Sequence, residues 1–429
     1  MQTSITDYGA VRDISTLQTA AIQNAIDACA AAGGGTVVVP AGTYRTGTIR
    51  LRSNITLYLE NGALLKGPDT IEEYSRYPFP WSLYPHTIAL ILAVKERNVR
   101  IRGEGAIDFN GRAFAMKDKL AVADGVPDAL LVDVHYEMPE REKRPNRLVF
   151  FDSCEDVEIS GVTFRDSPTW TLVFHHCSFL RLRDFRVEND LRIPNNDGIH
   201  CCGCRDVIIT GCCFACGDDC IAVTSISDES LVNERFVISD CLFQSASAAL
   251  RLGFQGGKLR DVHVRNCIIR DSNRGVAVFA GENGFVENVS LEGLTMGTRL
   301  FAGYWWGKGE PLVICSSDAD ASIRNVTLRN AAIRAENSIV VSGTAGSVTG
   351  VRLENLDVEL SYGTRRPWFG DKIDLSPNRC KPAPDATIAI PWLWSDGASQ
   401  IEFTHVTVSR RRGESVAFDT REMILQQEV

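Results

Sequence analysis

The feature that most constrains this chain of 429 residues is a repeat with a period of about 25 residues. In each copy, apolar residues alternate with polar or small ones, a pattern typical of strands rather than helices. The copies begin at Val157, Leu180, Val207, Phe236, Val262, Val289, Val326 and Val351, with outlying copies at Val99 and Ile401. Short strands at this spacing predict coils that stack on one another as a β-solenoid.

The kind of solenoid follows from what the copies lack. Leucine-rich repeats have a similar period, but they require a fixed frame of Leu and Asn that is absent here. We therefore expect an all-β fold, a right-handed parallel β-helix.

Cysteines recur at fixed places in the repeat. Cys212, Cys241 and Cys267 lie five residues after the start of their copies, and Cys154, Cys177 and Cys204 lie three residues before. Equivalent positions in stacked coils are about 4.8 Å apart, which predicts two ladders of small buried side chains. A zinc site is the alternative, because cysteines crowd between residues 201 and 220. We expect no metal, no cofactor and no disulfide framework.

The start of the chain has a different pattern. Apolar residues from Leu17 through Ile26 to Cys29 predict a helix that Ser15 or Thr16 caps and that ends at the glycines of residues 33–35. Such a helix would cover the unpaired strand edges of the first coil. We expect one β-helix domain over residues 1–429, with an N-terminal cap region over residues 1–50.

Two long irregular stretches interrupt the repeat, at residues 108–147 and 362–398. Long loops on a regular scaffold usually build the binding face. We expect these insertions to close one end of a groove, which favours action on chain ends.

Charge and hydropathy exclude several classes of partner. The chain carries 45 Lys and Arg against 54 Asp and Glu, a net charge of −9, which disfavours binding to nucleic acid or to anionic membranes. No apolar run reaches the roughly 18 residues of a membrane span. Met1 is not followed by a secretory signal. With its many thiols, the chain is predicted to be cytoplasmic, or secreted if a leader was removed.

Two acidic motifs carry the candidate chemistry. One reads Asn195-Asn196-Asp197-Gly198-Ile199-His200, and the other reads Gly217-Asp218-Asp219. Asp197 and Asp218 are one short coil apart, so we expect them to be stacked neighbours on one face. Crowded carboxylates raise the pKa of at least one of them. Glycoside hydrolysis needs this arrangement, with one protonated acid and one carboxylate that activates water. A calcium site or simple turn residues are the alternatives.

With these motifs, the chain resembles family 28 of the glycoside hydrolases, the polygalacturonase-like group. The resemblance extends over nearly the whole sequence. It includes Asp7-Tyr8-Gly9-Ala10, Val39-Pro40-Ala41-Gly42-Thr43-Tyr44, Arg144-Pro145-Asn146-Arg147 and Ser167-Pro168-Thr169-Trp170-Thr171. It implies a right-handed parallel β-helix that hydrolyses with inversion. It also implies that Asp218 is the general acid and that Asp197 and Asp219 hold and activate the water.

Two motifs of the family are missing. Polygalacturonases have a Gly-His-Gly segment where this chain has residues 247–253, which contain no histidine. They also have Arg-Ile-Lys, the cations that read a galacturonate carboxylate, where this chain has Ala277 and Phe279. Arg251 and Arg274 are nearby cations at other positions. We therefore expect poor action on plain polygalacturonic acid.

Further residues are candidates for substrate binding. The faces of Trp305 and Trp306 would stack on sugar rings, and Lys308 or Glu310 would contact a substrate group; the alternative is a packed turn between coils. His200 would line the cleft or be a buried structural residue. Arg251 and Arg274 complete the predicted binding set.

The sequence thus predicts hydrolysis of an O-glycosidic bond in a pectic or other plant cell-wall oligosaccharide. A polysaccharide lyase or an isomerising enzyme on the same scaffold is one alternative, with Arg251 as its candidate base. A noncatalytic glycan-binding β-helix is another, although a cluster of three carboxylates is unfavourable for stability alone.

Overall fold

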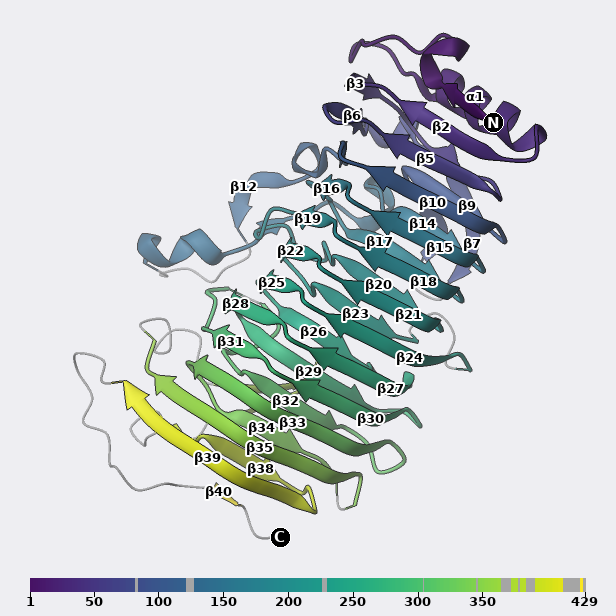
Figure 1. The fold of residues 1–429 in the computed structure, drawn as a ribbon. Coiled ribbons are helices and arrows are strands. Elements are labelled where there is room, and N and C mark those ends of the chain that lie inside the picture. Colours follow the sequence, from purple (N-terminus) through teal and green to yellow (C-terminus); the bar gives the residue numbers. More distant parts are fainter. Residues whose placement is uncertain are drawn as a thin grey trace.

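The computed structural model describes the chain except residues 82–83, 121–126, 226–229, 304, 345, 364–371, 377–378, 383–389, 412–424 and 427–429. The described residues form a stack of coils that runs from the N-terminal helix α1 to the C-terminal strands (Figure 1). Each coil contributes parallel strands to two large sheets, as the repeat predicted. The fold is a right-handed parallel β-helix.

The larger sheet has 22 described strands, and we call it the major sheet. Its strands are β1 (Gln2–Ser4), β2 (Gly35–Val39), β3 (Gly42–Arg45), β5 (Ile55–Leu59), β6 (Ala63–Lys66), β10 (Arg97–Gly103), β11 (Ala106–Asp108), β15 (Glu155–Ser160), β16 (Thr163–Arg165), β18 (Ser178–Arg183), β19 (Arg186–Glu188), β21 (Arg205–Thr210), β22 (Cys213–Cys216), β24 (Val232–Ser239), β25 (Leu242–Ser245), β27 (Lys258–Arg265), β28 (Ile268–Ser272), β30 (Phe285–Glu292), β31 (Thr295–Thr298), β33 (Ser322–Ala335), β35 (Val348–Ser361) and β39 (Ile401–Arg411).

The second sheet has 12 described strands, and we call it the site sheet because the candidate active site lies on it. Its strands are β4 (Ile49–Arg50), β9 (Ile91–Val94), β14 (Arg147–Asp152), β17 (Trp170–His175), β20 (Ile199–Cys202), β23 (Ile221–Thr224), β26 (Ala248–Leu252), β29 (Arg274–Ala280), β32 (Leu312–Ser316), β34 (Ile339–Ser342), β38 (Leu393–Asp396) and β40 (Leu425–Gln426).

The predicted starts of the repeat copies fall into one column of the major sheet. Val99 pairs with Val157, and the same column continues without a slip through all the predicted positions to Ile401. A slip of one residue would turn the apolar side chains of a strand to solvent, so the alternation fixes the register.

The coils enclose one apolar core that extends from Ile5 to Leu393. Stacked side chains of the same kind fill it, including an aromatic series from Phe109 to Phe243 with ring centroids 5.4–6.4 Å apart. The predicted cysteine ladders are also present. The backbone N–H of Cys154 donates to the Cys177 sulfur at 3.4 Å, and Cys241 lies between Cys212 and Cys267.

The N-terminal cap has the predicted helix with a different start. Helix α1 (Thr19–Ala31) buries Ile22, Ile26 and Cys29 against the first coil. The predicted N-cap was wrong: the residue before the helix is Gln18, and its side chain does not cap. Ser15 and Thr16 hydrogen-bond to Asp13 instead, because an Asp two or three residues upstream competes for local donors.

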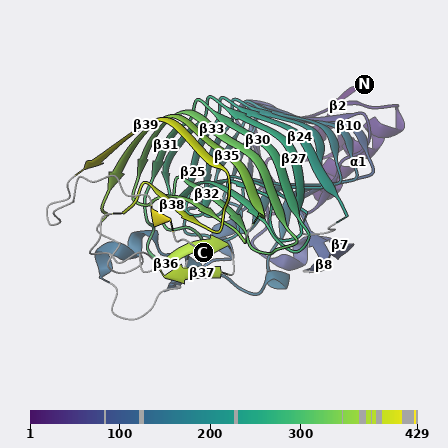
Figure 2. The ribbon, with the colours of Figure 1, turned by 90° about the horizontal axis from the view of Figure 1, so that it is seen from below.

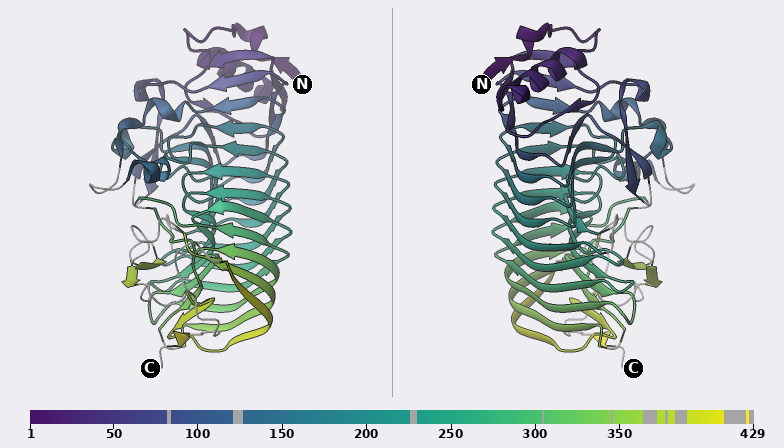
Figure 3. Two further views of the ribbon diagram at one scale, coloured as in Figure 1. Left: turned by 90° about the vertical axis from the view of Figure 1, so that its left-hand side faces the viewer. Right: turned by 90° about the vertical axis from the view of Figure 1, so that its right-hand side faces the viewer.

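Other segments leave the stack. Residues 108–147 contain the hairpin of β12 (Met116–Leu120) and β13 (Tyr136–Glu137), as expected for an insertion. The β36 (Lys372–Ser376) and β37 (Arg379–Pro382) hairpin belongs to the second predicted insertion and projects from the same side of the stack (Figure 3). A third hairpin, β7 (Arg76–Trp81) and β8 (Tyr84–Ile88), was not predicted. The short 3-10 helices span Ile5–Tyr8, Ile71–Glu73, Gly111–Ala113, Asp128–Asp133 and Arg141–Lys143. None of the described helices has the length and apolar character that a membrane span requires.

Candidate active site

Both acidic motifs lead directly into strands of the site sheet, β20 and β23. Along the outward face of this sheet, His200, Ala222, Arg251 and Ala277 follow one another in register on β20, β23, β26 and β29. The alternate residues of the same strands point into the apolar core. A polar side chain in this column therefore faces the loops that cover the sheet.

The register corrects the expected stacking of the carboxylates. Ile199 pairs with Ile221, so Asp197 lies at the level of Asp219, each two residues before the paired isoleucine. Asp218 comes one residue earlier in its coil. The prediction that Asp197 stacks on Asp218 was therefore wrong by one position, because the coil here is 22 residues long by the pairing.

The motif residues beside the carboxylates hold the two coils together. The Asn196 side chain accepts from the Gly217 backbone at 2.5 Å and donates to the Asp190 carbonyl at 2.9 Å. A Cβ atom on Gly217 would lie 2.2 Å from the Ile193 carbonyl oxygen, so only glycine fits there. The local sequence thus determines where the adjacent aspartates lie.

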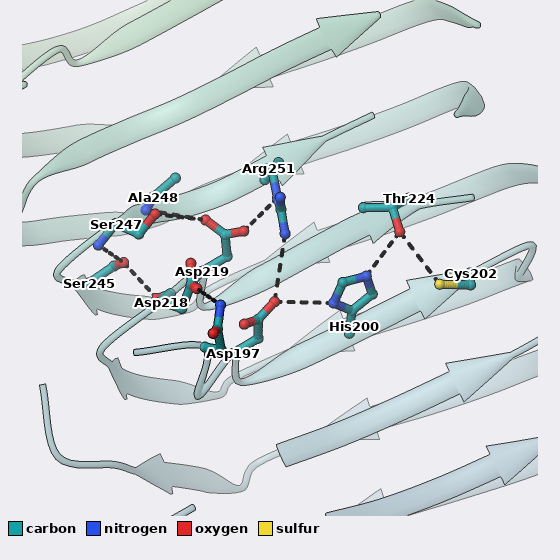
Figure 4. Close-up of polar contacts among 11 residues, drawn as sticks. Asp197, His200, Cys202, Asp218, Asp219, Thr224, Ser245, Ser247, Ala248 and Arg251 are labelled. Atoms are coloured by element: carbon teal, nitrogen blue, oxygen red, sulfur yellow. Dashed lines mark hydrogen bonds and ion pairs between the residues drawn. The ribbon is translucent and has the colours of Figure 1, made fainter. Parts of the chain in front are cut away.

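Arg251 joins two of the carboxylates. Its Nε lies 2.5 Å from Oδ2 of Asp219, and its Nη2 lies 3.7 Å from Oδ2 of Asp197 (Figure 4). The side chains of all three residues are at most 5% exposed. The guanidinium also faces the rings of Phe254 and Trp306. This cation is therefore enclosed, and its charge is used to balance carboxylates of the protein.

Burial raises the pKa of Asp219, as expected for crowded carboxylates. The charge of Arg251 opposes this shift, whereas the carboxylates of Asp218 and Asp197 add to it. Asp219 also accepts from the Ala248 backbone at 3.3 Å. Its charge state therefore depends on Arg251.

His200 is the buried structural residue of the two predicted alternatives. Its Nδ1 lies 3.1 Å from Asp197, and its Nε2 lies 2.9 Å from the Thr224 hydroxyl. A neutral ring that donates to the carboxylate from Nδ1 accepts from Thr224 at Nε2. His200 is fully buried and contacts the Trp170 ring at 4.1 Å between centroids. His200 therefore orients the Asp197 carboxylate through the Nδ1 contact.

Asp218 differs from the other two carboxylates because it lines a pocket. The pocket has a volume of about 240 Å³, and its walls are His135, Pro194, Asn195, Asp218, Ser247, Trp305 and Trp306. Asn195 donates to Oδ2 of Asp218 at 3.2 Å, and the Asp219 backbone donates to Oδ1 at 2.9 Å. Asp218 is thus held with one edge toward the pocket.

Two distant segments meet over this pocket. Asp133 and His135 come from the first insertion, and Arg299 and Trp305 come from the loop after β31. Arg299 makes a bidentate ion pair with Asp133 at 2.9 and 3.0 Å. The Trp305 indole donates to the Asp133 carbonyl at 2.7 Å, and its ring packs edge-on against His135. We call these contacts the insertion clamp.

The remaining predicted binding residues lie outside the pocket wall. Arg274 and Glu310 form a buried ion pair, with Nε and Oε2 3.3 Å apart. Glu310 also accepts from the Lys308 backbone at 2.6 Å, and Lys308 is half-buried. The Arg274–Glu310 pair and the Lys308 backbone contact hold the loop that carries the two tryptophans. Trp305 and Trp306 line the pocket with Asp218, whereas Arg274 and Glu310 are buried and do not line it.

Sequence reasoning missed several residues of the site. His135 had a weak signal, because it is the histidine within the predicted 108–147 insertion. Thr224 and Ser247 had no motif of their own, and their contacts with His200 and Asp219 depend on side-chain direction. Within the described residues, no group of His, Cys, Asp and Glu has the arrangement of a metal site.

A pocket carboxylate beside two further carboxylates provides the groups that hydrolysis of a glycosidic bond requires, on a scaffold of stacked coils. The family model of the glycosyl hydrolases family 28 matches residues 29–366. The chain therefore belongs to family 28 and is a glycoside hydrolase.

Relatives place the chain among polygalacturonase-like members. It is 25% identical to a probable polygalacturonase of Vitis vinifera, over 89% of this chain and 80% of the relative. It is 26% identical to an exo-poly-alpha-D-galacturonosidase of Dickeya chrysanthemi, over 66% of this chain and 54% of the relative.

Solved structures share the fold. An exopolygalacturonase from Thermotoga maritima superposes with a TM-score of 0.70 at 19% identity, covering 95% of this chain and 92% of the other. A family 28 exopolygalacturonase from Yersinia enterocolitica gives a TM-score of 0.66 at 19% identity, covering 96% and 78%.

The positions that depart from the family pattern are apolar in the structure. Ala277 and Phe279 are buried in a cluster with Ala248 and Val313. Arg251 pairs with Ala277 of the next coil. The two residues therefore occupy the same column, with Arg251 one coil closer to the N-terminus. Arg251 thus lies one coil nearer to the carboxylates than Ala277 does.

Proposed function

We propose that this protein removes a terminal sugar from a pectin-derived oligosaccharide by inverting hydrolysis of its glycosidic bond. Asp218 acts as the general acid, and Asp197 and Asp219 hold and activate the water. The observation that carries this proposal is the single carboxylate edge of Asp218 in the pocket, beside two buried carboxylates bridged by Arg251.

The roles follow from access and charge. The acid has to reach the leaving oxygen of the substrate, and Asp218 is the aspartate that lines the pocket. The base has to be ionised. Burial raises the pKa of Asp219 and the Arg251 guanidinium opposes that shift, so Asp219 depends on Arg251 for its charged form. Asp197 contacts His200 and Arg251 instead. The division of labour thus agrees with the roles that the family resemblance implies.

The contacts of Arg251 argue against a lyase. A lyase on this scaffold would need Arg251 as the base that removes a proton from the sugar. A guanidinium keeps its proton in proteins, and this one is engaged by two carboxylates. Hydrolysis requires no proton transfer by Arg251, which can remain the charged partner of Asp219.

The covering of the site sheet supports action at chain ends. Before the site, Phe79 of the β7–β8 hairpin packs on Phe150 and Trp170; after it, Leu375 of β36 packs on the cluster of Phe279 and Trp394. Both hairpins lie along the same edge of the stack in Figure 2. A pocket with covered sheet on either side favours a terminal sugar over an internal one.

Relatives support the substrate class. The relatives and superposed structures described above are named as polygalacturonases, exopolygalacturonases and an exo-poly-alpha-D-galacturonosidase. We propose an oligosaccharide from pectin or another plant cell-wall polymer as the substrate. The many buried thiols fit a cytoplasmic enzyme that receives such fragments after import.

Asp218→Asn tests the assignment of the acid. Because an amide cannot supply the proton, kcat on unactivated pectic oligosaccharides should fall by about 10²–10⁴-fold with an unchanged fold. Proton NMR of the first anomer released by the wild-type protein should show inverted configuration.

Asp240→Asn is the matched control, because Asp240 is exposed in the bend between β24 and β25 and asparagine tolerates its left-handed backbone, φ 57°. The control should keep wild-type activity. Activity of Asp218→Asn within tenfold of wild type would remove the acid assignment, and a retained anomer would make one aspartate a nucleophile.

A further inference from the structure

We infer that the pocket selects an uncharged terminal sugar, and that His135 is a specificity-determining residue that accepts a hydrogen bond from one of its hydroxyls. The inference deepens the proposed function and rests on it, since it names the sugar class that occupies the pocket over Asp218. No motif of the chain pointed to His135.

His135 is built into the pocket wall rather than exposed on a loop. Its ring packs edge-on against Trp305 with centroids 4.8 Å apart, and the adjacent Asp133 is held by Arg299 and by the Trp305 indole. The insertion clamp therefore fixes the imidazole in the wall of the pocket that Asp218 also lines. A side chain held this way presents one defined polar atom to a ligand.

The hydrogen bonding of His135 indicates which atom that is. Nδ1 lies 3.2 Å from the Tyr136 carbonyl oxygen, which requires a donor at Nδ1. A neutral ring then has Nε2 as an acceptor. Burial lowers the pKa of His135, against the opposing effects of the Tyr136 carbonyl and the Asp218 charge, so the ring is neutral at neutral pH. An acceptor attracts a sugar hydroxyl and repels a carboxylate.

Three arginines around the pocket are already paired with carboxylates of the chain. Arg251 is bound by Asp219 and Asp197, and Arg274 is bound by Glu310. Arg299 is bound by Asp133 and Asp271. Among the described residues that line the pocket, Asp218 is the one charged side chain. A substrate carboxylate would therefore meet an anion and no cation in the described lining of the pocket.

The shape of the pocket suits one sugar ring. Its volume of about 240 Å³ is below the roughly 300–1,000 Å³ typical of sites for drug-sized ligands. Trp305 and Trp306 provide aromatic faces, which pack on the apolar face of a sugar ring. The pocket thus offers two aromatic faces for stacking, the His135 acceptor for a hydroxyl group, and the Asp218 acid. A neutral sugar can use all three kinds of contact.

The first test compares matched ligands. The two oligosaccharides have the same chain behind the terminal sugar and differ only at C6 of that sugar. One has a hydroxymethyl group there, and the other has a carboxylate. Calorimetry on Asp218→Asn measures binding without turnover. This variant lacks the Asp218 charge that would repel the carboxylate ligand, so the comparison is biased against the inference. If the neutral ligand still binds at least tenfold more tightly than the carboxylate ligand, the inference is confirmed. With the wild-type protein, we expect about 100-fold higher kcat/KM for the neutral substrate.

The second test changes His135. His135→Lys places a donor cation in the wall and should shift the ratio of the two dissociation constants toward the carboxylate by about tenfold. His135→Gln keeps a neutral acceptor and should keep the preference. His263→Lys is the control, because His263 is exposed on β27 of the major sheet, and it should change nothing.

The outcomes separate the inference from the proposed function. Equal or tighter binding of the carboxylate ligand, or binding of neither, overturns the inference even if the protein hydrolyses glycosides. An unchanged ratio in His135→Lys overturns the role of His135. Preferential binding of the neutral ligand without release of a sugar by the wild-type protein confirms the pocket and overturns the hydrolysis.

Discussion

Arg251 is the residue on which the charge balance of the site depends. Three carboxylates lie together in a region with almost no access to solvent, and this guanidinium is in contact with two of them. The pairing offsets the cost of removing these charges from water, and loss of one partner leaves the others uncompensated. Arg251 is thus a positioning residue that acts through Asp197 and Asp219.

Arg251→Met should destabilise the protein by about 3–5 kcal/mol, because it leaves buried carboxylates without their cation. The double variant Arg251→Met/Asp219→Asn should recover part of this loss. Urea denaturation followed by circular dichroism measures both. A recovery in the double variant distinguishes a charge effect from a packing effect, which would leave the two variants equally unstable.

The loss should depend on pH. Without the guanidinium, burial and the neighbouring carboxylates raise the pKa of Asp219 in the folded state further above 3.8, its ordinary value. A carboxyl group with a raised pKa favours the folded state below the unfolded pKa and loses this advantage as pH rises through the folded pKa. The stability deficit of Arg251→Met should be small near pH 4 and grow toward neutral pH, and equal deficits at both would contradict it.

At this scale, the sequence predicted the identity of the residues better than their contacts. Asp197, Asp218 and Asp219 were found from their motifs, and Trp305 and Trp306 from their chemistry. The alignment of Asp197 with Asp219 was missed, because a spacing in sequence does not give the exact length of a coil. The direction of the Arg251 side chain toward the carboxylates is set by rotamer and packing, which no spacing encodes.

At the scale of elements, strands with a repeated pattern were predictable and single ones were not. Ten copies of the same alternation determined one column, because every copy has to bury the same face. The β7–β8 segment belongs to no repeat copy, and its sequence contains Pro78, Pro80 and Pro85, which are unfavourable in strands. The start of α1 was misplaced because Asp13 competes for Ser15 and Thr16.

Breaking the insertion clamp should weaken substrate binding more than it lowers the stability of the fold. Arg299→Gln removes the bidentate pair with Asp133 and releases the wall that carries His135, so KM should rise by about tenfold. Because Asp133 is nearly buried and loses its cation, Tm should also fall by a few degrees. Asp133→Asn should have the same effect, and the double variant should add little. Steady-state kinetics and calorimetry measure these quantities.

Arg329→Gln is the control for the clamp, because it breaks an exposed ion pair with Glu292 on the major sheet. It should leave KM unchanged. A fall in Tm of many degrees in Arg299→Gln would assign the clamp a structural role instead.

The cysteine ladders lead to a prediction about reactivity. In the described part of the chain, Cys213 is partly exposed and the other cysteines are buried. In the native protein, thiol reagents should react quickly with Cys213 and slowly with the buried ladder residues. After unfolding without reductant, titration should find all fourteen thiols. A much lower count would reveal disulfides.

At the scale of the whole molecule, hairpins on either side of the pocket decide how a long substrate can approach. The site sheet is covered before and after the pocket, so the proposed action at chain ends predicts that a polymer does not lie along the sheet through the site. Products of a labelled oligosaccharide should therefore be single sugars from one end at early times, and chromatography resolves them. Early fragments of intermediate length would indicate internal cleavage.

The insertion clamp also has a consequence for biosynthesis. Each coil pairs only with its neighbours, so a nascent chain can add coils to the capped end as it leaves the ribosome. The pocket cannot form in this order, because Asp133 and Arg299 are 166 residues apart. At about 5–20 residues per second, translation separates these partners by roughly ten to thirty seconds. Once Asp219 has emerged, the ribosome holds a growing stack whose aspartates are already adjacent and whose pocket wall does not yet exist.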